Sequence, residues 1–310
     1  MENGSSGAPL ILERLSVTSR SSVPAFVLLL LVYVFILASN VGLVALISRT
    51  RSLRQPMYLL FCNMSVNDVL GATVVVPHVL RGLSEPGAQR LIGYSGCVLQ
   101  AFCVHLHAGA SHTVLMIMAF DRYVAICSPL RYGAVMTGRT VAALSAAAWA
   151  SAFVLVLVLV GLSVRLSRCR RVVLNPFCDN ASLFKLSCES LLANHVYGLG
   201  YTVVLLGSSL GGVALTYLKI AVVCVSGKNK SVNRKALQTC ASHLAAYVTL
   251  LVSGFLIVVL HRFPQLADHR KVASVVGHVA LPALNAVVYG LQIKEVRQRV
   301  WDLFRNNKAA

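Results

Sequence analysis

The stretch Pro24–Ser48 reads PAFVLLLLVYVFILASNVGLVALIS and carries no charged side chain. As a helix it is about 37 Å long, enough to cross the hydrocarbon core of a bilayer, which is about 30 Å thick. It is longer than the apolar part of a secretory signal peptide, and no A-x-A-like cleavage site follows it. The stretch therefore predicts a retained membrane-spanning helix.

The rest of the chain continues this pattern. Hydrophobic residues make up 57% of it and charged residues 12%, and the mean hydropathy is +0.73. Six further segments are long and apolar enough to span a membrane: Met57–Leu80, Gly96–Ile126, Val141–Val164, Leu199–Val225, Leu237–Leu260 and Val272–Leu291. We predict an all-α membrane protein, a seven-transmembrane helix bundle in one domain over residues 1–310, with residues 1–23 before the bundle (24–291) and a helix and tail after it (292–310).

An odd number of spans places the two termini on opposite sides of the membrane. With the N-terminus outside, more than half of the 28 lysines and arginines fall on the inner side, as the positive-inside rule favours. Basic loops facing anionic membrane lipid account for most of the net charge of +18, so no nucleic acid is needed as a partner. In this orientation Asn3, in the sequon Asn3-Gly4-Ser5, is a candidate glycosylation site.

Four of the nine cysteines fall on the outer side, which is the oxidising one: Cys97, Cys169, Cys178 and Cys188. We expect disulfides among them. Four cysteines allow three connectivities, and their spacing does not choose between these. Asn180, in a second sequon, lies close to Cys178 and is the weaker glycosylation candidate.

One carboxylate, Asp68, lies well inside a predicted span. Such a group is costly unless it faces the bundle interior and has partners. The candidate partners are Asn40, Ser111 and Asn285 in other spans, and together they predict a polar cluster able to hold a sodium ion with its waters. A purely structural hydrogen-bond network is the alternative interpretation.

Three histidines lie in the third span. His105 and His112 share a helix face but are about 10.5 Å apart along the axis, too far to share one metal ion. His107 points elsewhere, and we interpret these groups as buried or cavity-lining imidazoles. The sequence contains no H-E-x-x-H, G-x-S-x-G, P-loop or dinucleotide-binding motif. We therefore expect neither an enzyme nor a metal site, and no cofactor beyond the sodium ion.

The end of the chain carries two further signals. No lysine occurs between Val272 and Ile293, so a retinal Schiff base has no anchor, and Pro282 predicts a kink in the seventh span. The segment KEVRQRVWDLF, Lys294–Phe304, has its apolar residues at helical spacing. It predicts a short amphipathic helix on the inner membrane surface; a frayed basic tail is the alternative.

Five motifs follow one another along the chain: PMYLLFCNMSVNDV (Pro56–Val69), MAFDRYVAICSPLRY (Met118–Tyr132), FCDNASLFKLSC (Phe177–Cys188), KALQTCASHL (Lys235–Leu244) and PALNAVVYGLQIKEVR (Pro282–Arg297). Together they resemble the motifs of rhodopsin-like G-protein-coupled receptors, and among these the odorant receptors. The resemblance implies a plasma-membrane receptor that binds a small odorant. It also implies activation of the stimulatory olfactory G protein, which raises cyclic AMP.

The resemblance assigns roles that spacing leaves open. It implies the disulfides Cys97–Cys178 and Cys169–Cys188. It further implies that Asp121 holds Arg122 inactive until the sixth helix moves outward and Arg122 meets the G protein. The activation and coupling residues implied in this way are Asp121, Arg122, Tyr123, Tyr217, His243, Asn285 and Tyr289.

Two positions depart from the family pattern. The usual Asn-Pro of the seventh helix is Asn285-Ala286 here, so a local kink must come from Pro282. The Phe-Tyr pair in the middle of the sixth helix is replaced by Leu250-Leu251, which puts the usual activation switch in doubt. These departures are consistent with a divergent, fish-like receptor or with one that signals weakly.

The family implies a ligand cavity between the outer halves of the third, fifth and sixth spans. The predicted lining is Val104, His105, Ala108, Gly109, His112, Tyr201, Thr202, Leu205, Leu251, Phe255, Val258 and Val259. The outer mouth is basic, which favours an acidic ligand. The arginines concerned are Arg81, Arg90, Arg165, Arg168, Arg170, Arg171 and Arg262.

Two other classes of protein fit the sequence less well. A transporter or channel predicts several intramembrane charges or broken helices in paired halves, whereas this chain shows one buried acid and no repeat. A receptor for a peptide, an amine or a lipid would share the fold. The outer third span has Val104 where an amine receptor needs an acid, so the odorant interpretation is preferred.

Overall fold

The computed structural model describes residues 8–17, 19–53, 55–85, 87–226, 230–260, 263–292 and 297–298, without the side chains of residues 19, 52, 230–239, 264, 291 and 292. Asn3, Arg262 and most of the predicted amphipathic helix Lys294–Phe304 lie outside the described residues. In the part that is described, seven helices are long and apolar enough to cross a membrane. The predicted seven-helix architecture is therefore confirmed.

The elements follow one another with short connections. In chain order they are β1 (Leu10–Leu12), α1 (Ser19–Arg49), η1 (Arg51–Leu53), α2 (Pro56–Ser84), β2 (Arg90–Ile92), α3 (Tyr94–Cys127), η2 (Pro129–Arg131), α4 (Tyr132–Val135), α5 (Gly138–Val164), β3 (Val172–Val173), α6 (Asn180–Phe184), α7 (Leu192–Ser226), α8 (Lys230–Leu260), η3 (Pro264–Leu266) and α9 (Ala267–Gln292).

The long helices extend beyond the apolar segments that predicted them. The predicted fifth span began at Leu199, whereas α7 begins at Leu192, and α9 begins at Ala267 rather than Val272. Hydropathy detects the part of a helix that lies in hydrocarbon, but the backbone hydrogen bonds continue into the polar headgroup region. Pro24, Pro77 and Pro282 lie inside helices, where the ring removes one backbone donor.

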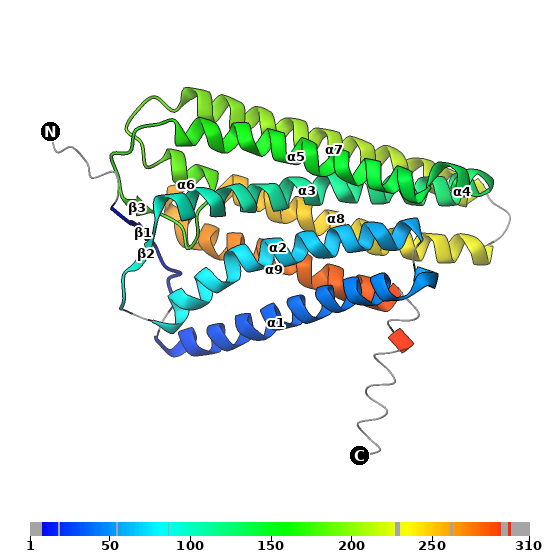
Figure 1. Cartoon of the computed structure of the whole chain (residues 1–310), viewed down its shortest axis with the longest axis horizontal. Coiled ribbons are helices and arrows are strands. Elements are labelled where there is room, and N and C mark those ends of the chain that lie inside the picture. The colour runs from blue at the N-terminus through cyan, green and yellow to red at the C-terminus, as the bar shows by residue number, and fades with distance from the viewer. Residues whose placement is uncertain are drawn as a thin grey trace, which may run out of the picture.

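Helix α3 runs through the middle of the bundle and contacts α2, α5, α7 and α8 (Figure 1). Small residues let its neighbours approach closely. A Cβ atom placed on Gly71 of α2 would lie 2.5 Å from the His107 ring of α3. The opposite faces of the outer helices are apolar and exposed, and Leu31, Leu215 and Phe255 each show more than 60% of their surface. In a bilayer these side chains contact lipid.

A small sheet closes one end of the bundle, where both disulfides lie; we call this the disulfide end, and the opposite one the Arg122 end. Strand β1 lies between β2, to which it is antiparallel, and β3, to which it is parallel. Leu10 and Leu12 of β1 are buried in a cluster with Cys97 and Cys178. The segment before α1 is thus partly folded onto the bundle (Figure 1).

Candidate functional site

An acid and a base lie side by side at the end of α3. The Asp121 side chain is 1% exposed and that of Arg122 is 16% exposed. Arg122 donates from Nε to Asp121 Oδ2 at 3.0 Å, and its Nη2 contacts the same oxygen. An ion pair with so little exposure to water is stable only when its hydrogen bonds offset the cost of desolvation. The arrangement holds the guanidinium against its own helix.

Tyr132 of α4 completes the surroundings of Asp121. Its hydroxyl donates to Asp121 Oδ1 at 2.8 Å. Burial, together with the charge and hydrogen bond of Asp121, raises the pKa of Tyr132 above its usual value, so the phenol remains a donor at neutral pH. Both carboxylate oxygens therefore have partners. Sequence reasoning missed Tyr132, although it ends the quoted motif MAFDRYVAICSPLRY.

A narrow crevice of about 10 Å³ joins the Asp121–Arg122 pair to other predicted activation residues. It is lined by both members of the pair and by His243 of α8 and Tyr289 of α9. The Tyr289 ring stacks on Phe61 with centroids 4.3 Å apart. The Tyr289 hydroxyl is buried and has no hydrogen-bond partner among the described residues. The fold thus brings four predicted activation residues to one place.

Two more predicted residues adjoin this crevice. The Tyr217 hydroxyl lies 2.6 Å from His243 Nδ1, which links α7 to α8. Tyr123 packs beside Tyr217 in the apolar cluster around Ile220, and the Lys219 ammonium lies 5.5 Å from the centre of the Tyr123 ring. Asn285 is not part of this group.

Asn285 belongs to a separate polar cluster in the middle of the bundle. Its Nδ2 donates to Asp68 Oδ2 at 2.9 Å. Asn40 and Ser111 are also fully buried, but Ser111 accepts from Asn67 and Asn40 donates within its own helix. Thus the structure shows a direct contact of Asp68 only with Asn285 among the predicted partners.

The predicted ligand residues divide into two groups. His112 of α3 lies 3.1 Å from Ser209 Oγ of α7, and Tyr247 of α8 donates to the same oxygen at 3.0 Å. The hydroxyl of Tyr201 lies over Gly109, where an added Cβ would be 3.3 Å from it. These contacts connect α3 with α7 and α8. Leu205 is buried, whereas Ala108, Thr202, Leu251 and Val259 are half-buried on these helices.

The second group lies elsewhere. Val104 packs with residues of α2 and α9. His105 Nε2 accepts a hydrogen bond from the Asn180 backbone and so faces α6. Phe255 and Val258 are 65% and 44% exposed on the outside of α8. The structure does not bring these four side chains together with the His112 group.

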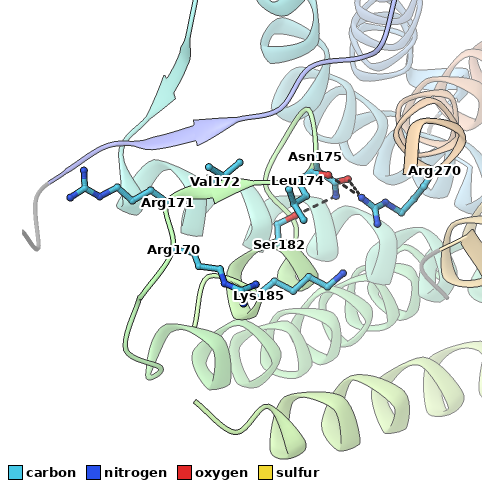
Figure 2. A pocket seen from close by; sticks show the side chains of 8 residues that line it. All are labelled: Arg170, Arg171, Val172, Leu174, Asn175, Ser182, Lys185 and Arg270. Carbon is cyan, nitrogen blue, oxygen red and sulfur yellow. Dashed lines mark hydrogen bonds between the residues drawn. The ribbon is translucent and has the colours of Figure 1, made fainter. Parts of the chain in front are cut away.

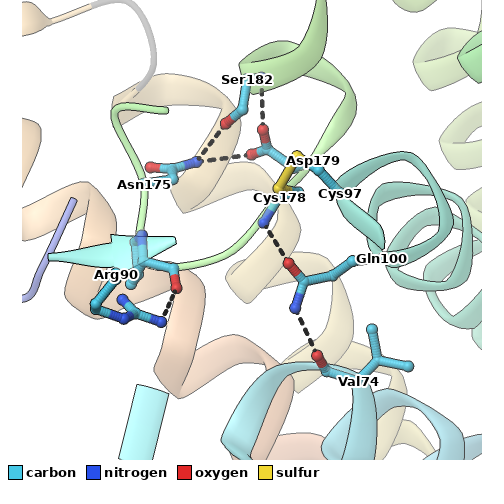
Figure 3. The surroundings of a disulfide bond; sticks show 9 residues. Val74, Arg90, Cys97, Gln100, Asn175, Cys178, Asp179 and Ser182 are labelled. Atoms are coloured by element: carbon cyan, nitrogen blue, oxygen red, sulfur yellow. Dashed lines mark hydrogen bonds between the residues drawn. A yellow bond between two sulfur atoms is a disulfide. The ribbon is translucent and has the colours of Figure 1, made fainter. Parts of the chain in front are cut away.

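Both disulfides join the pairs that the family resemblance implies: Cys97–Cys178 and Cys169–Cys188. The first fastens the long loop to α3. Beside it, Gln100 donates to Val74 O of α2 and accepts from the Cys178 backbone (Figure 3). Asn180, the second sequon residue, is only 5% exposed and accepts a hydrogen bond from Ser163. Its glycosylation would therefore have to precede folding.

Several residues of the site escaped sequence reasoning. Tyr247 lies one helical turn before Leu250-Leu251, so an aromatic ring does face α3, although not at the expected position. Ser209, which joins His112 to Tyr247, looks like any other serine of an apolar span. Lys185 and Arg270 at the disulfide end were likewise not singled out. None of these residues has a local sequence signal, because their partners are distant along the chain.

The chain folds into a seven-helix membrane bundle with a buried Asp-Arg pair at the end of its third long helix. A disulfide joins that helix to the long loop between α5 and α7. This is the architecture of a rhodopsin-like receptor. The model of the olfactory receptor family matches residues 29–307. The chain is similar to Olfactory receptor 52N5 of Homo sapiens, at 33% identity over 90% of this chain and 87% of the relative.

The sequence identity to two proteins of Gallus gallus is about as high. Olfactory receptor-like protein COR2 of Gallus gallus is 34% identical over 96% of each chain, and COR4 of the same species is 33% identical over 99% of each chain. The chain belongs to the olfactory receptor family, whose members are multi-pass G-protein-coupled receptors of the plasma membrane and not enzymes.

Proposed function

We propose that this receptor binds a small odorant between α3, α7 and α8 and activates the stimulatory olfactory G protein, which raises cyclic AMP. The N-terminus and the disulfide end face outward, and the Arg122 end faces the cytosol. Two arguments support the orientation. Disulfides persist on the oxidising side, and in the sequence somewhat more than half of the 28 lysines and arginines fall in the segments assigned to the inner side.

The observation that carries the proposal is the restraint on Arg122. Asp121 accepts from its guanidinium, and Tyr132 occupies the other carboxylate oxygen. A G protein that binds this end must compete with Asp121 for Arg122. Separation of Arg122 from Asp121 and opening of the crevice are then one conformational change. A conformational equilibrium of this kind shifts only if the ligand binds the two states with different affinity.

Helix α8 offers a physical connection between the two ends. Tyr247 takes part in the His112–Ser209 contact, and His243 contacts Tyr217 at the Arg122 end. These two α8 residues are four apart, so their side chains lie on the same helix face. A ligand that displaces Tyr247 therefore moves the face that carries His243.

The ligand itself would contact the polar atoms that face the α3–α7 boundary. The Tyr201 hydroxyl is buried and has no partner among the described residues, so it can donate to a carbonyl, hydroxyl or carboxylate of an odorant. The absence of a side chain at Gly109 lets this hydroxyl approach α3 closely. A panel of carboxylic acids, sulfates and neutral odorants tests the expectation of an acidic ligand; responses confined to neutral or cationic compounds would contradict it.

The cluster around Asp68 fits a small monovalent cation. Asp68 Oδ1, Asn40 Oδ1 and Asn285 Oδ1 are buried without hydrogen-bond partners in the described part of the chain. They are oxygen ligands, which hard cations prefer. A sodium ion bound there would balance the carboxylate charge and hold α2 against α9.

The test of the proposed function is Arg122→Ala. Compared at equal surface expression, the variant should lose the cyclic AMP response to any odorant found in the panel, because the G protein loses its cationic contact. Arg139→Ala is the matched control, since Arg139 is an exposed base near the same end that does not line the crevice. An unchanged odorant response in Arg122→Ala would refute the role of Arg122.

A further inference from the structure

A pocket of about 250 Å³ opens at the disulfide end, between the loop that carries β3 and α6 and the beginning of α9. Figure 2 shows the side chains around it. Four of the lining residues are basic, namely Arg170, Arg171, Lys185 and Arg270. No acidic residue is among the described residues that line the pocket. Positive charge is thus concentrated in a space that could take only a small molecule.

Arg270 is the most constrained of the four bases. It is 7% exposed, and its Nη2 donates to Leu174 O at 2.9 Å and to Asn175 Oδ1 at 3.3 Å. Its Nε has no hydrogen-bond partner within the described part of the chain. A buried donor without an acceptor is costly, and an oxygen of a bound anion would satisfy it.

Lys185 approaches the same region from the other side of the loop. In Figure 2 its side chain extends toward the part of the pocket that Arg270 borders, while Arg171 points away. Burial, and then the positive charge of Arg270, lower the pKa of Lys185. Two like charges held near each other in a partly buried pocket repel, and a bound anion relieves this repulsion.

The nearby acids already have partners. Asp179 accepts from Asn175 Nδ2 at 2.9 Å and from the Ser182 backbone at 2.7 Å. Glu13 and Asp268 both contact Lys271 Nζ, at 2.8 and 3.3 Å. The donors to Asp179 are neutral, so its charge remains and acts on Lys185, where it opposes the lowering of the pKa by Arg270. One acid against four bases leaves the pocket with a net positive charge, which an anion from solution would balance.

We propose that this pocket binds a small oxyanion, a carboxylate or a sulfate group, with Arg270 and Lys185 as its main contacts. The planar guanidinium suits two oxygens of one acid group, and the ammonium supplies a second charge. A bound anion joins the disulfide-linked loop to α9. The site is separate from the odorant site proposed between α3, α7 and α8, and it does not depend on the proposed signalling.

The experiment measures thermal unfolding of the full-length receptor in nanodiscs of zwitterionic phosphatidylcholine. Inorganic sulfate is the probe, compared with chloride at equal ionic strength. A ligand that binds the folded state raises the midpoint as its concentration increases. We expect a saturable rise with sulfate. Equal midpoints in sulfate and chloride would overturn the proposal.

Variants then locate the effect. Lys185→Gln removes a base whose ammonium makes no hydrogen bond or ion pair within the described part of the chain. The variant should weaken sulfate binding about tenfold or more, as expected for the loss of a charge-assisted contact. Arg270→Lys keeps the charge but removes Nε, and should weaken it as well. Arg20→Gln, an exposed base on α1 outside the pocket, should leave it unchanged.

Equal sulfate effects in all three variants would show screening of general charge and refute the site. A final arm replaces part of the phosphatidylcholine with phosphatidylglycerol in the absence of sulfate. Stabilisation by this lipid that Lys185→Gln abolishes would identify a lipid headgroup as the occupant, which would also overturn the assignment to a small soluble anion.

Discussion

At the scale of single residues, the pair at the end of α3 shows how a charged group is kept in an apolar protein. Asp121 is almost fully buried, yet both of its oxygens accept hydrogen bonds, from Arg122 and Tyr132. A buried carboxylate oxygen without a donor would lose its contact with water and gain no hydrogen bond in exchange, which is destabilising. The restraint on Arg122 therefore depends on a residue outside the pair.

Tyr132→Phe tests that dependence. The change removes one hydrogen bond to a charged acceptor, which contributes about 1.5–3 kcal/mol in general, and it weakens the state in which Arg122 is held. We expect basal cyclic AMP to rise about 3- to 10-fold at equal surface expression. Tyr33→Phe, which removes a hydroxyl that donates to Thr73 between the middle parts of α1 and α2, is the control. If Tyr132→Phe leaves basal signalling at the control level, Tyr132 does not restrain the pair.

At the scale of helices, close packing of α2 on α3 positions the polar contacts beside Asp68. His107 lies against Gly71, and its Nδ1 is 3.0 Å from Asn67 O. Asn67 in turn donates to Ser111, one helical turn beyond His107. One glycine thus permits a set of polar contacts between the two helices beside Asp68.

Gly71→Ala should disturb this packing. The new Cβ would lie 2.5 Å from a buried, hydrogen-bonded ring, so the helices must separate, at a cost of about 1–3 kcal/mol. We expect a lower midpoint of thermal unfolding and less receptor at the cell surface. Gly42→Ala is the matched helical control, because its Cβ meets no atom within 4 Å. Equal stability of the two variants would contradict the close approach.

At the scale of the whole molecule, the disulfide end is built from segments far apart in sequence. Strand β1 pairs with β2 and β3, and Lys271 of α9 contacts Glu13 just after β1. Residues 8–17, before the first span, therefore close the bundle rather than extend from it. The same assembly places Arg270 beside Leu174 and Asn175.

Leu12→Ala should weaken this closure. Leu12 is 4% exposed, and truncation of a buried leucine costs about 2–5 kcal/mol. Thermal unfolding of the purified receptor should shift to lower temperature, and sulfate binding in the neighbouring pocket should weaken with it. Val17→Ala, at a 39% exposed position, serves as the control. A Leu12→Ala receptor as stable as this control would show that β1 contributes nothing to the bundle.

The predicted activation residues differ in how far the sequence could place them. Asp121 and Arg122 are neighbours, and one helix position determines both. Tyr217, His243 and Tyr289 were assigned by family resemblance, and the structure adds the contact between the first two. The predicted ligand face was less successful, because Val104 and His105 turn toward other elements. Helices with apolar residues on most sides leave their rotation about the axis undetermined by hydropathy.

The sequence alone determined the seven spans, the pair at the end of α3 and the four cysteines that form the two disulfides. Each depends on local information, since a helix in lipid satisfies its backbone within one segment. Only the tertiary structure decided that Asn285 contacts Asp68 across 217 positions and that Arg270 and Lys185 border one pocket. Such contacts depend on the rotation and register of packed helices, which arise from all neighbours together.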